Sequence, residues 1–310
     1  MHRLRIGVTG TGALGRHHVR LLSDLDGAEL VGICDADPEA ARTVAEAHGA
    51  KVFATVEELA GEVEAMVVAV PTRDHEAVAG PLLEAGRHVL VEKPITFDVD
   101  GADRLIAAAG DRVLAVGHVE FYNPAVQALV KRAGRPRFLE IQRLSVFTRR
   151  SLDIDVVLDL MIHDIQILHA LDASPVGEVR AVGVDVLSDR IDIANARIRL
   201  ASGCVANLTA SRVSASRVRE LRLFSEDAYY SLDYQEQSLK GFRLEGEAGA
   251  RQISGLTVEV EKAEPLRREL EAFVAVCRGD EVPYVDGRSG RQALATALAF
   301  VAAAAEGGEA

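Results

Sequence analysis

A glycine-rich turn directly behind a short apolar run constrains this chain more than any other feature. Residues 3–15 read RLRIGVTGTGALG, in which the glycines have the spacing G-x-G-x-x-G. In a strand–turn–helix unit the first glycine allows the tight turn, the second lets a pyrophosphate approach the backbone, and the third lets the helix pack against the strand. The helix then directs unpaired N–H groups at the phosphates. The residues predicted to form this phosphate site are Gly10, Thr11, Gly12, Ala13, Leu14 and Gly15.

The segments around the turn decide between a dinucleotide site and an ordinary strand-to-helix turn, because the glycines alone fit both. Leu4, Ile6 and Val8 indicate a strand. Residues 14–25 indicate a helix, and residues 28–34 (AELVGIC) indicate a second strand. Strand, turn, helix and strand in this order favour the dinucleotide site.

Asp35 ends the second predicted strand about 20 residues after the last glycine, where a dinucleotide fold places its ribose-binding acid. Its carboxylate would accept hydrogen bonds from the adenine-ribose hydroxyls and would repel a 2′-phosphate. Ala36 follows, and no arginine stands beside the acid in the sequence. The sequence therefore favours NAD over NADP as the cofactor.

The first part of the chain alternates strand-like and helix-like segments. Buried strands are predicted at residues 65–70, 88–91 and 113–116, with helical patterns between them. Continuous apolar strands separated by helices indicate a parallel, doubly wound sheet.

The rest of the chain has a different pattern. A strongly apolar helix is predicted over residues 156–171, and period-two segments between 179 and 234 favour a mostly antiparallel sheet. The predicted fold class is α/β, with an N-terminal Rossmann doubly wound parallel sheet and a C-terminal α+β domain that has a mostly antiparallel open sheet. We expect an NAD-binding Rossmann domain at 1–122 and a substrate-binding and oligomerisation domain at 123–310.

Composition and charge exclude several classes of protein. The 310 residues carry a formal net charge of −12, which argues against a nucleic-acid surface, because such a surface needs clustered lysine and arginine. No apolar run reaches the ~18–20 residues of a membrane span, and the N-terminus lacks the apolar core of a signal peptide. The three cysteines, Cys34, Cys204 and Cys277, are widely spaced and fit buried residues in a reducing compartment. We expect a cytoplasmic protein that binds neither nucleic acid nor membrane.

Glu92-Lys93-Pro94 stands at the carboxyl end of a predicted sheet strand, where open α/β sheets bind ligands. There, the ammonium of Lys93 can reach a substrate hydroxyl beside the nicotinamide and stabilise an alkoxide that develops during hydride removal. A cis peptide bond before Pro94 would fix the direction of the lysine. A surface lysine in a loop is the alternative. The further residues predicted to line the cofactor groove are Pro71, Thr72, His75, Glu92 and Lys93.

Asp159 and His163 stand four residues apart in the segment VVLDLMIHDIQIL, so they share one face of the predicted helix. Their neighbours are apolar, and ionisable groups inside a buried helix are costly unless they are paired or used in chemistry. Histidine can take up a hydroxyl proton near neutral pH, which makes His163 a candidate general base. A structural Asp–His pair in the core is the alternative. Since no third or fourth ligand stands at helical spacing, we expect no metal.

These motifs, in this order and over nearly the whole chain, resemble those of the glucose–fructose oxidoreductase/inositol dehydrogenase (Gfo/Idh/MocA) family. The resemblance implies that Lys93 and His163 are the catalytic pair and that Asp159 helps to place the sugar. Family members often have an acid where this chain has Gln166, and many have arginine where it has Phe121, so contacts that need those charges are not expected here. The matching residues are Gly10 to Gly15, Asp35, Glu92-Lys93-Pro94, Gly117, Asn123-Pro124, Asp159 and His163.

Two segments look closest to the nucleotide-sugar branch of the family, that of the UDP-N-acetylglucosamine 3-dehydrogenases. They are GHVEFYNPAV at 117–126 and RSLDIDVVLDLMIHDI at 150–165. Arginines near the end of a predicted strand could hold a diphosphate through bidentate hydrogen bonds, and a solvated basic patch is the alternative. The residues predicted to bind substrate are His118, Glu120, Asn123, Arg143, Arg149 and Arg150.

The sequence thus predicts an NAD-dependent dehydrogenase that oxidises a ring hydroxyl of a nucleotide sugar. His163 would take the hydroxyl proton while hydride passes to the nicotinamide, Lys93 would polarise the same oxygen, and Asp159 would orient Lys93 or a neighbouring hydroxyl. The alternatives are a free-sugar or inositol dehydrogenase of the same family and a non-catalytic dinucleotide-binding sensor, which needs no proton acceptor. By the family resemblance we expect a homo-oligomer, either dimer or tetramer, joined through an exposed face of the C-terminal sheet.

Overall fold

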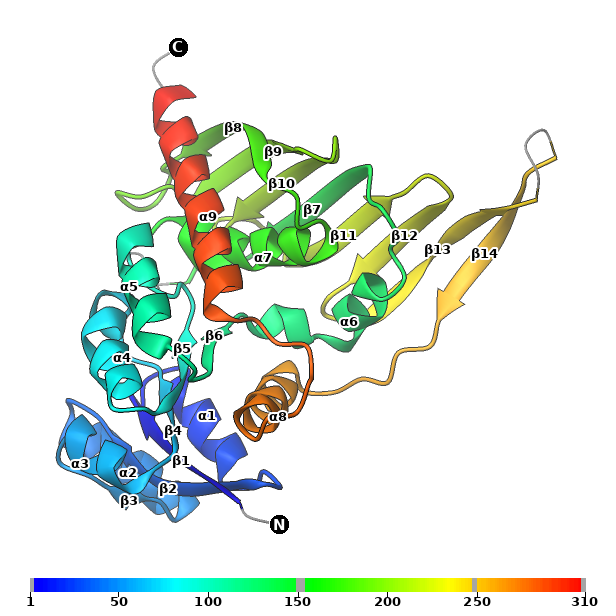
Figure 1. Cartoon of the computed structure of the whole chain (residues 1–310). Helices are drawn as coiled ribbons and strands as arrows, with labels where there is room; N and C mark the ends of the chain where they lie inside the picture. The colour runs from blue at the N-terminus through cyan, green and yellow to red at the C-terminus, as the bar shows by residue number, and fades with distance from the viewer. Residues whose placement is uncertain (1–2, 149–153, 247–249, 308–310) are drawn as a thin grey trace. The chain divides into compact units, whose positions relative to one another are not determined.

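The computed structural model describes residues 3–148, 154–246 and 250–307, and the chain divides into two compact units (Figure 1). Unit 1 comprises Met1–Val119 and Glu264–Arg291, and unit 2 comprises Glu120–Ala263 and Gln292–Ala310. This division differs from a single boundary after residue 122, because residues 264–291 return to unit 1. The functions assigned to the two domains stay predictions.

Unit 1 contains a six-stranded sheet in the order β3-β2-β1-β4-β5-β6, and all neighbouring strands are parallel. This confirms the predicted Rossmann sheet. Its strands are β1 (Leu4–Thr9), β2 (Ala28–Cys34), β3 (Lys51–Val52), β4 (Ala65–Val68), β5 (His88–Glu92) and β6 (Leu114–Gly117). Its helices are α1 (Gly15–Leu22), α2 (Pro38–His48), α3 (Val56–Glu62), the 3₁₀ turn η1 (Thr72–Asp74), α4 (His75–Glu84), α5 (Val99–Ala109) and α8 (Pro265–Cys277).

The core of unit 1 explains why α8 belongs to it. Ile6 and Val8 of β1 have no exposed surface, and Leu270 and Phe273 of α8 join them in one apolar core. Each such side chain contributes roughly 1.5–3 kcal/mol when it is fully buried. Residues 266–277 also look helical in the sequence, and α8 confirms this, but the sequence does not reveal which sheet the helix covers.

Unit 2 contains an eight-stranded sheet in the order β14-β13-β12-β11-β7-β10-β9-β8. The neighbours β7 and β10 are parallel, and the other neighbouring pairs are antiparallel, which confirms the mostly antiparallel sheet. Its strands are β7 (Phe138–Leu144), β8 (Val176–Val184), β9 (Ile193–Leu200), β10 (Val205–Ser211), β11 (Val218–Phe224), β12 (Ala228–Asp233), β13 (Ser238–Glu245) and β14 (Gln252–Val258).

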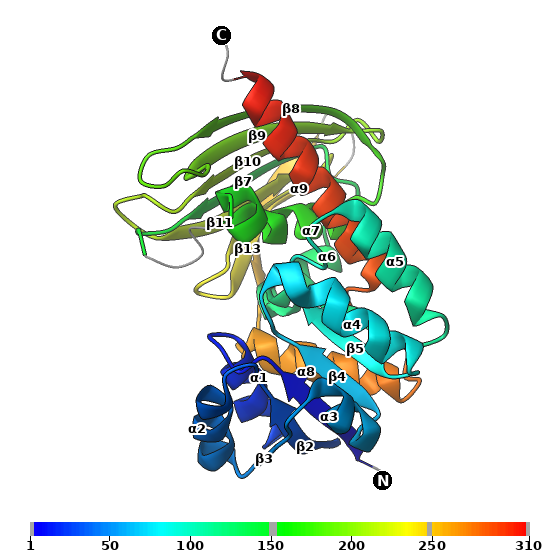
Figure 2. The same cartoon turned by 90° about the vertical axis from the view of Figure 1, so that its left-hand side faces the viewer.

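Helices cover one face of this sheet (Figures 1 and 2). Alternate residues of β7, such as Leu139 and Ile141, point to that face and share an apolar core with Ile165 and Phe300. The helical segments are the 3₁₀ turn η2 (Val119–Tyr122), α6 (Pro124–Val130), the π-turn η3 (Val157–Met161), α7 (Ile162–Leu171) and α9 (Gly287–Gly307), which begins in unit 1 and continues in unit 2.

The sequence does not predict β13 and β14, which form the end of the sheet. Most of their side chains are exposed or half-buried, so the contrast between apolar and polar positions is weak. Each strand also contains a glycine, Gly241 or Gly255, which lowers the strand signal. At position 241 the backbones approach so closely that a Cβ would lie 1.9 Å from the carbonyl oxygen of Tyr229.

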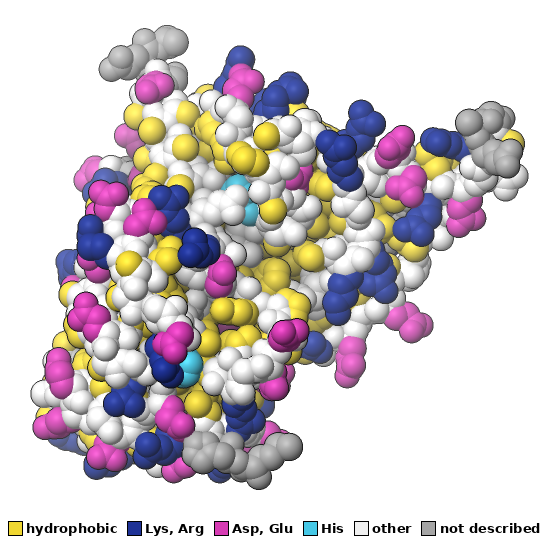
Figure 3. All heavy atoms as spheres, viewed as in Figure 1, with side chains coloured by type: hydrophobic (Ala, Val, Ile, Leu, Met, Phe, Trp, Pro, Cys, Tyr) yellow, Lys and Arg dark blue, Asp and Glu magenta, His cyan; other side chains and the backbone are white. Residues whose placement is uncertain are grey.

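The surface carries charges of both signs. On the face shown in Figure 3, Lys and Arg side chains are interspersed with Asp and Glu side chains. Among the described residues, no helix has the length and apolar character that a membrane crossing requires.

A buried ion pair fixes the start of the helix that carries Asp159 and His163. Nε of Arg212 donates to Oδ1 of Asp192 at 2.7 Å, and Oδ2 accepts the backbone N–H groups of residues 186–188 at 2.6–3.0 Å. Nη1 of Arg212 donates to the carbonyl oxygen of Ile154 at 2.8 Å, shortly before η3. Burial raises the pKa of Asp192, but these hydrogen bonds outweigh it and hold the pKa well below its ordinary value.

Asp192→Asn is expected to lower the free energy of unfolding by about 3–5 kcal/mol, because it leaves Arg212 buried without its counter-charge. In the wild type this contribution is complete above the unfolded-state pKa of about 3.9 and is lost as the pH falls through the lower folded-state pKa. Urea unfolding between about pH 3 and 7 measures the effect, and the difference between the two proteins should shrink as the pH falls.

Glu178→Gln is the control, because Glu178 pairs with Arg180 on the surface, where the side chains are 50% and 80% exposed. It should change the free energy of unfolding by less than about 0.5 kcal/mol. An Asp192→Asn protein as stable as the wild type at neutral pH would show that the buried pair does not hold this helix.

Candidate functional site

The carboxyl edge of the six-stranded sheet collects the predicted residues of unit 1. Because all strands run in the same direction, the loops that follow them meet at one edge. Chain order reverses between β1 and β4, which creates a switch point where open α/β sheets bind ligands. The residues at this edge are Gly10 after β1, Asp35 after β2, Thr72 after β4, Lys93 after β5 and His118 after β6.

The three glycines of the turn have the geometry that their predicted roles need. Gly10 has a φ of +84°, and a Cβ there would lie 2.6 Å from the carbonyl oxygen of Ala69. A Cβ on Gly15 would lie 1.8 Å from the carbonyl oxygen of Gly10, so only glycine lets α1 pack here. Gly12 is exposed, and apart from Gly12 itself and its two chain neighbours, no heavy atom of the described residues lies within 4 Å of the place that its Cβ would take. That side of the turn is open to a ligand.

Asp35 is bonded to the glycine turn through its carboxylate. Oδ2 accepts the backbone N–H of Thr11 at 2.5 Å and its hydroxyl at 2.8 Å, and Oδ1 accepts the N–H of Asp37 at 2.9 Å. Burial raises the pKa of Asp35, but these hydrogen bonds outweigh it and hold the pKa below its ordinary value. The half-buried carboxylate is therefore ionised at neutral pH, and its oxygens keep acceptor capacity for a ribose hydroxyl.

Lys93 and His118 leave the sheet side by side, because Glu92 and Gly117 are partners in the β5–β6 ladder. The Lys93–Pro94 peptide bond is cis, and Lys93 is half-buried. His118 is fully buried, and burial, followed by the positive charge of Lys93, lowers its pKa to about 3. His118 is therefore a neutral imidazole, which fits a hydrogen-bonding role and not that of a cation.

The surroundings of His75 argue against the prediction that it lines the cofactor groove. The buried ring lies between two carbonyl oxygens, with Nδ1 2.9 Å from that of Pro94 and Nε2 3.0 Å from that of Val70. It joins the loop after β4 to the loop after β5, so it acts on the groove through these loops. Pro71 is exposed and Thr72 is half-buried, and both stay candidates for cofactor contact.

In unit 2, Asp159 and His163 lie on one helix that contains a turn the sequence does not predict. Asp159 is part of the π-turn η3, and His163 is in the first turn of α7. Both side chains are half-buried. Single π-turns recur at functional sites, and the apolar periodicity of the sequence carries no signal for them.

Arg143 lies in the core of unit 2 and not at an open phosphate site. Its Nε and Nη2 donate to the two carboxylate oxygens of Asp164 at 2.9 and 2.7 Å, and Nη1 donates to Oε1 of Glu120 at 2.8 Å. Burial lowers the pKa of Arg143, but Asp164 and Glu120 outweigh it, so the guanidinium stays charged. Only 1% of Arg143 is exposed, which argues against the predicted contact with a diphosphate.

Asn123 and Glu120, two further predicted substrate residues, have partners inside unit 2. Asn123 is buried; its Oδ1 accepts a backbone N–H of α6 at 3.0 Å, and its Nδ2 donates to the carbonyl oxygen of Tyr234 at 2.9 Å. These bonds argue against a substrate contact. Glu120 also accepts a hydrogen bond from Nη1 of Arg219 at 3.3 Å, but it is half-buried and stays a candidate.

The sequence patterns do not single out Asp164, which positions the helix that carries His163. Asp164 directly follows His163, so its bidentate bond to Arg143 fixes the rotation of α7 about its axis. The sequence does hint at its role, because Asp164 is a further ionisable residue in an otherwise apolar segment. Such a residue needs a polar partner when it is buried.

Gly15→Ala is expected to lower the free energy of unfolding by about 3 kcal/mol or more, because its Cβ would overlap a backbone oxygen. Gly12→Ala should change it by less than about 0.5 kcal/mol and should weaken NADH binding at least about tenfold, because its methyl group enters the open side of the turn. Thermal unfolding and fluorescence titration with NADH measure the two effects. Wild-type NADH affinity in Gly12→Ala would contradict a pyrophosphate site at this turn.

Arg143→Met should lower the free energy of unfolding by about 3–5 kcal/mol, because it leaves Asp164 buried without a counter-charge. The double variant Arg143→Met/Asp164→Leu removes both charges and should recover much of this loss. Denaturant unfolding compares the two. Equal losses in the single and double variants would mean that lost packing, and not the unpaired charge, causes the effect.

Comparisons with known proteins agree with this geometry. The family model described as an oxidoreductase family with an NAD-binding Rossmann fold, Gfo/Idh/MocA, matches residues 4–118. The chain is 39% identical over 307 residues to the UDP-N-acetylglucosamine 3-dehydrogenase of Acidithiobacillus ferrooxidans, and this match covers 96% of each protein. A solved structure of UDP-N-acetylglucosamine 3-dehydrogenase from the same organism matches with a TM-score of 0.91 and 38% identity over 98% of each chain.

A second relative has a shorter match. The inositol 2-dehydrogenase/D-chiro-inositol 3-dehydrogenase of Shouchella clausii is 35% identical over 54% of this chain and 53% of that enzyme. The nearly full-length match to the first relative confirms the predicted fold class and the predicted oxidoreductase activity with a dinucleotide cofactor. The chain therefore belongs to the Gfo/Idh/MocA oxidoreductase family.

Proposed function

We propose that this protein transfers hydride from a ring carbon of a nucleotide sugar to NAD, with UDP-N-acetylglucosamine as the first substrate to test. The match to the UDP-N-acetylglucosamine 3-dehydrogenase of Acidithiobacillus ferrooxidans carries this proposal, because it extends over 96% of both proteins. Both units of the chain therefore contribute to the likeness. The match to the inositol dehydrogenase covers 54% of this chain.

NAD, and not NADP, is the cofactor in this proposal. The ionised carboxylate of Asp35 lies at the end of β2, where a dinucleotide fold binds the adenine ribose. A 2′-phosphate would meet this negative charge directly. Ala36 and Asp37 follow, so the neighbouring residues add no positive charge to offset it.

In the proposed reaction the ring hydroxyl loses its proton to His163 while the carbon loses hydride, and a ketone remains. Bound NAD supplies the hydride acceptor. Histidine is the side chain suited to accept a hydroxyl proton near neutral pH, and this assigns the role of general base to His163. Lys93 donates a hydrogen bond to the same oxygen and stabilises the negative charge that develops on it. Asp159, four residues before His163 on the same helix, orients Lys93 or a neighbouring hydroxyl.

Substrate binding in this proposal depends on fewer arginines than the sequence predicts. Arg143 is engaged in the core, and Arg149 and Arg150 lie outside the described residues and stay candidates for the diphosphate. His118, neutral and next to Lys93, is a candidate hydrogen-bonding partner for the sugar.

The burial of Arg143 is the observation that favours the free-sugar or inositol alternative. It removes one of three arginines predicted to hold a diphosphate. A substrate without phosphate has no need of them, and the 35% identity to an inositol dehydrogenase points the same way.

We also propose a homo-oligomer that forms through the sheet face opposite the helices of unit 2. Phe138, Phe224, Tyr229 and Phe242 form a row on this face, with successive ring centres 4.9–6.3 Å apart. Phe224 is 37% exposed and Phe242 is 54% exposed. An exposed row of aromatic side chains is typical of an interaction surface.

Purified protein is expected to reduce NAD in the presence of UDP-N-acetylglucosamine, as measured by NADH absorbance, with a lower kcat/KM for NADP. His163→Asn should lower kcat by about 10²–10⁴-fold, because it removes the proton acceptor. Lys93→Met should lower kcat by about 10²–10³-fold, because it removes the donor to the developing alkoxide. His48→Asn in α2 and Lys131→Met after α6 are matched controls and should keep the wild-type rate.

Each alternative has its own outcome in these assays. Equal turnover of the unlinked sugar or of inositol would favour the free-sugar or inositol alternative. No NADH with any of these compounds, together with unchanged ligand binding in His163→Asn, would contradict the proposed reaction. A higher kcat/KM with NADP would contradict the choice of cofactor alone.

A further inference from the structure

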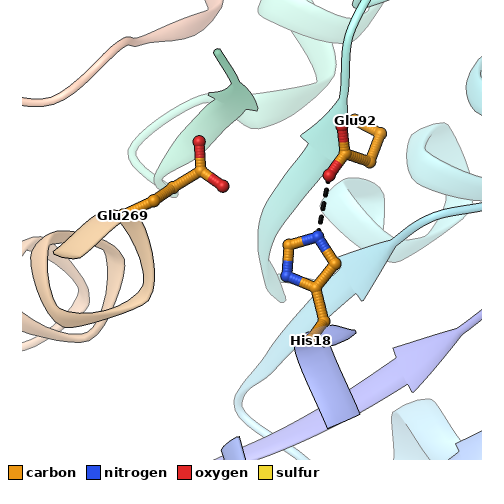
Figure 4. Close-up of side chains that lie close together, drawn as sticks. All are labelled: His18, Glu92 and Glu269. Carbon is orange, nitrogen blue, oxygen red and sulfur yellow. Dashed lines mark hydrogen bonds and ion pairs between the residues drawn. The ribbon is translucent and has the colours of Figure 1, made fainter. Parts of the chain in front are cut away.

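Three ionisable side chains form a buried cluster in unit 1 to which the proposed reaction assigns no chemical step. They are His18 of α1, Glu92 at the end of β5 and Glu269 of α8, which come from segments far apart in the sequence (Figure 4). Their exposed fractions are 0%, 6% and 1%. One nitrogen or oxygen atom of each lies within 4.8 Å of those of the other two.

His18 and Glu92 are bonded directly to each other. Nε2 of His18 lies 2.7 Å from Oε1 of Glu92 (Figure 4). Oε2 of Glu92 accepts the backbone N–H of Lys93 at 3.2 Å, and a Cβ on Gly117 would come within 2.9 Å of the same oxygen. The carboxylate of Glu92 is therefore held on several sides, and it holds the start of the segment that carries Lys93.

Glu269 points from α8 toward this pair (Figure 4). Among the described residues, neither of its carboxylate oxygens has a hydrogen-bond partner. An ionised Glu269 would be a buried charge without a donor, next to the like charge of Glu92, which is strongly unfavourable. A neutral carboxylic acid avoids that cost and has a proton to donate.

The surrounding elements offer Glu269 no other charged partner in the part of the chain that the structure describes. His18 from α1 and Glu92 from β5 are the titratable groups that face it, and β6 (LAVG) contains no ionisable residue. On the surface, Arg20 of α1 pairs with Glu264 directly before α8, and Arg267 of α8 pairs with Asp24 shortly after α1.

We propose that Glu269 is a neutral carboxylic acid that shares its proton with the His18–Glu92 pair. This proton allows α8 to pack against the segment that carries Lys93. Two hydrogen bonds through one bridging water span a gap of about this length. Glu269 is then a positioning residue, because it acts on the reaction only through Glu92 and Lys93. The role toward Lys93 rests on the proposed function, whereas the protonation does not.

A metal ion is the alternative occupant of these three side chains. Two ligand atoms at about 2.05 Å from a tetrahedral zinc ion lie about 3.3 Å apart. Nε2 of His18 and Oε1 of Glu92 are 2.7 Å apart, which is the length of a hydrogen bond. The geometry therefore favours a proton.

The protonation makes a specific prediction for stability. Burial, followed by the negative charge of Glu92, raises the pKa of Glu269 well above 4.5. Because the folded-state pKa is the higher one, the cost of ionisation is absent below the unfolded-state pKa and grows as the pH rises toward the folded-state pKa. In that interval the unfolding constant of the wild type rises by up to about tenfold per pH unit, relative to a protein with a neutral side chain at this position.

Glu269→Gln tests the proton, because glutamine has a matched size and is always neutral. We expect the unfolding constants of the two proteins, measured in urea, to diverge with this slope as the pH rises from about 5 to 9, with the variant the more stable. Glu269→Met repeats the comparison if Glu269→Gln does not fold. Glu271→Gln, an exposed glutamate on the same helix, is the matched control and should follow the wild type.

Parallel stability profiles of the wild type and the folded neutral variant would overturn the proposal. Failure of both neutral variants to fold would also overturn it, because the proposal holds that a neutral side chain suffices. If the purified wild type contains stoichiometric metal and Glu269→Gln does not, the cluster is a metal site, and the proposal of a shared proton is wrong.

The pH dependence of kcat/KM tests the role toward Lys93. The wild type should lose activity at alkaline pH as Glu269 ionises, and Glu269→Gln should retain it. If neither protein turns over the substrates above, the proposed function fails, and the dissociation constant of NADH over the same pH range becomes the readout. Identical alkaline activity profiles of wild type and variant would overturn the positioning role. The stability profiles would still decide whether Glu269 is protonated in the folded protein.

Discussion

The close approach of α1 to β1 determines most of the arrangement in unit 1. A Cβ on Gly15 would lie 1.8 Å from the carbonyl oxygen of Gly10, so the helix reaches this position only without a side chain there. The approach places the start of α1 at the phosphate turn and, one turn later, buries His18 against Glu92. Because Glu92 accepts a hydrogen bond from the backbone N–H of Lys93, the same packing also helps to position the predicted catalytic lysine. The dinucleotide turn and the lysine are therefore parts of one packed arrangement.

Unit 2 positions its helix through buried charges. Arg143 on β7 holds Asp164 with two parallel hydrogen bonds, and Arg212 joins Asp192 to the backbone just before the helix. A buried ion pair adds little stability over apolar side chains of the same size, but its bidentate geometry is directional. A rotation of α7 would leave two charges buried and unpaired. The direction of His163, which precedes Asp164, is therefore fixed by the contact of the next residue, about 100° around the helix axis.

The elements that depend on local sequence could be predicted, and the partners that depend on tertiary contacts could not. Glycine spacing, apolar strands and a strand-end acid are sufficient for the parallel sheet and its carboxyl edge. Arg143, by contrast, resembles a surface cation, because nothing in the sequence shows that Asp164 faces it across the core. His75 and Asn123 are polar residues near predicted sites, yet their hydrogen bonds go to backbone groups brought close by the fold. For Glu269, too, the helix could be predicted from the local sequence, but its neighbours His18 and Glu92 could not, because the fold brings them together.

A protein with a net charge of −12 that handles anionic ligands needs local positive potential at its site. At the carboxyl edge of unit 1 this potential depends on Lys93, because His118 is neutral beside it. Glu92 already places one carboxylate directly before the lysine, and His18 is bonded to it. An ionised Glu269 would add a second negative charge within 4.8 Å of Glu92 and weaken the potential of Lys93. Alcohol oxidation creates negative charge on the substrate oxygen, which Lys93 is proposed to stabilise. A protonated Glu269 leaves the positive potential of Lys93 undiminished, so it indirectly helps to stabilise the negative charge that hydride transfer creates on the substrate oxygen. In this proposal Glu269 itself does not contact the substrate.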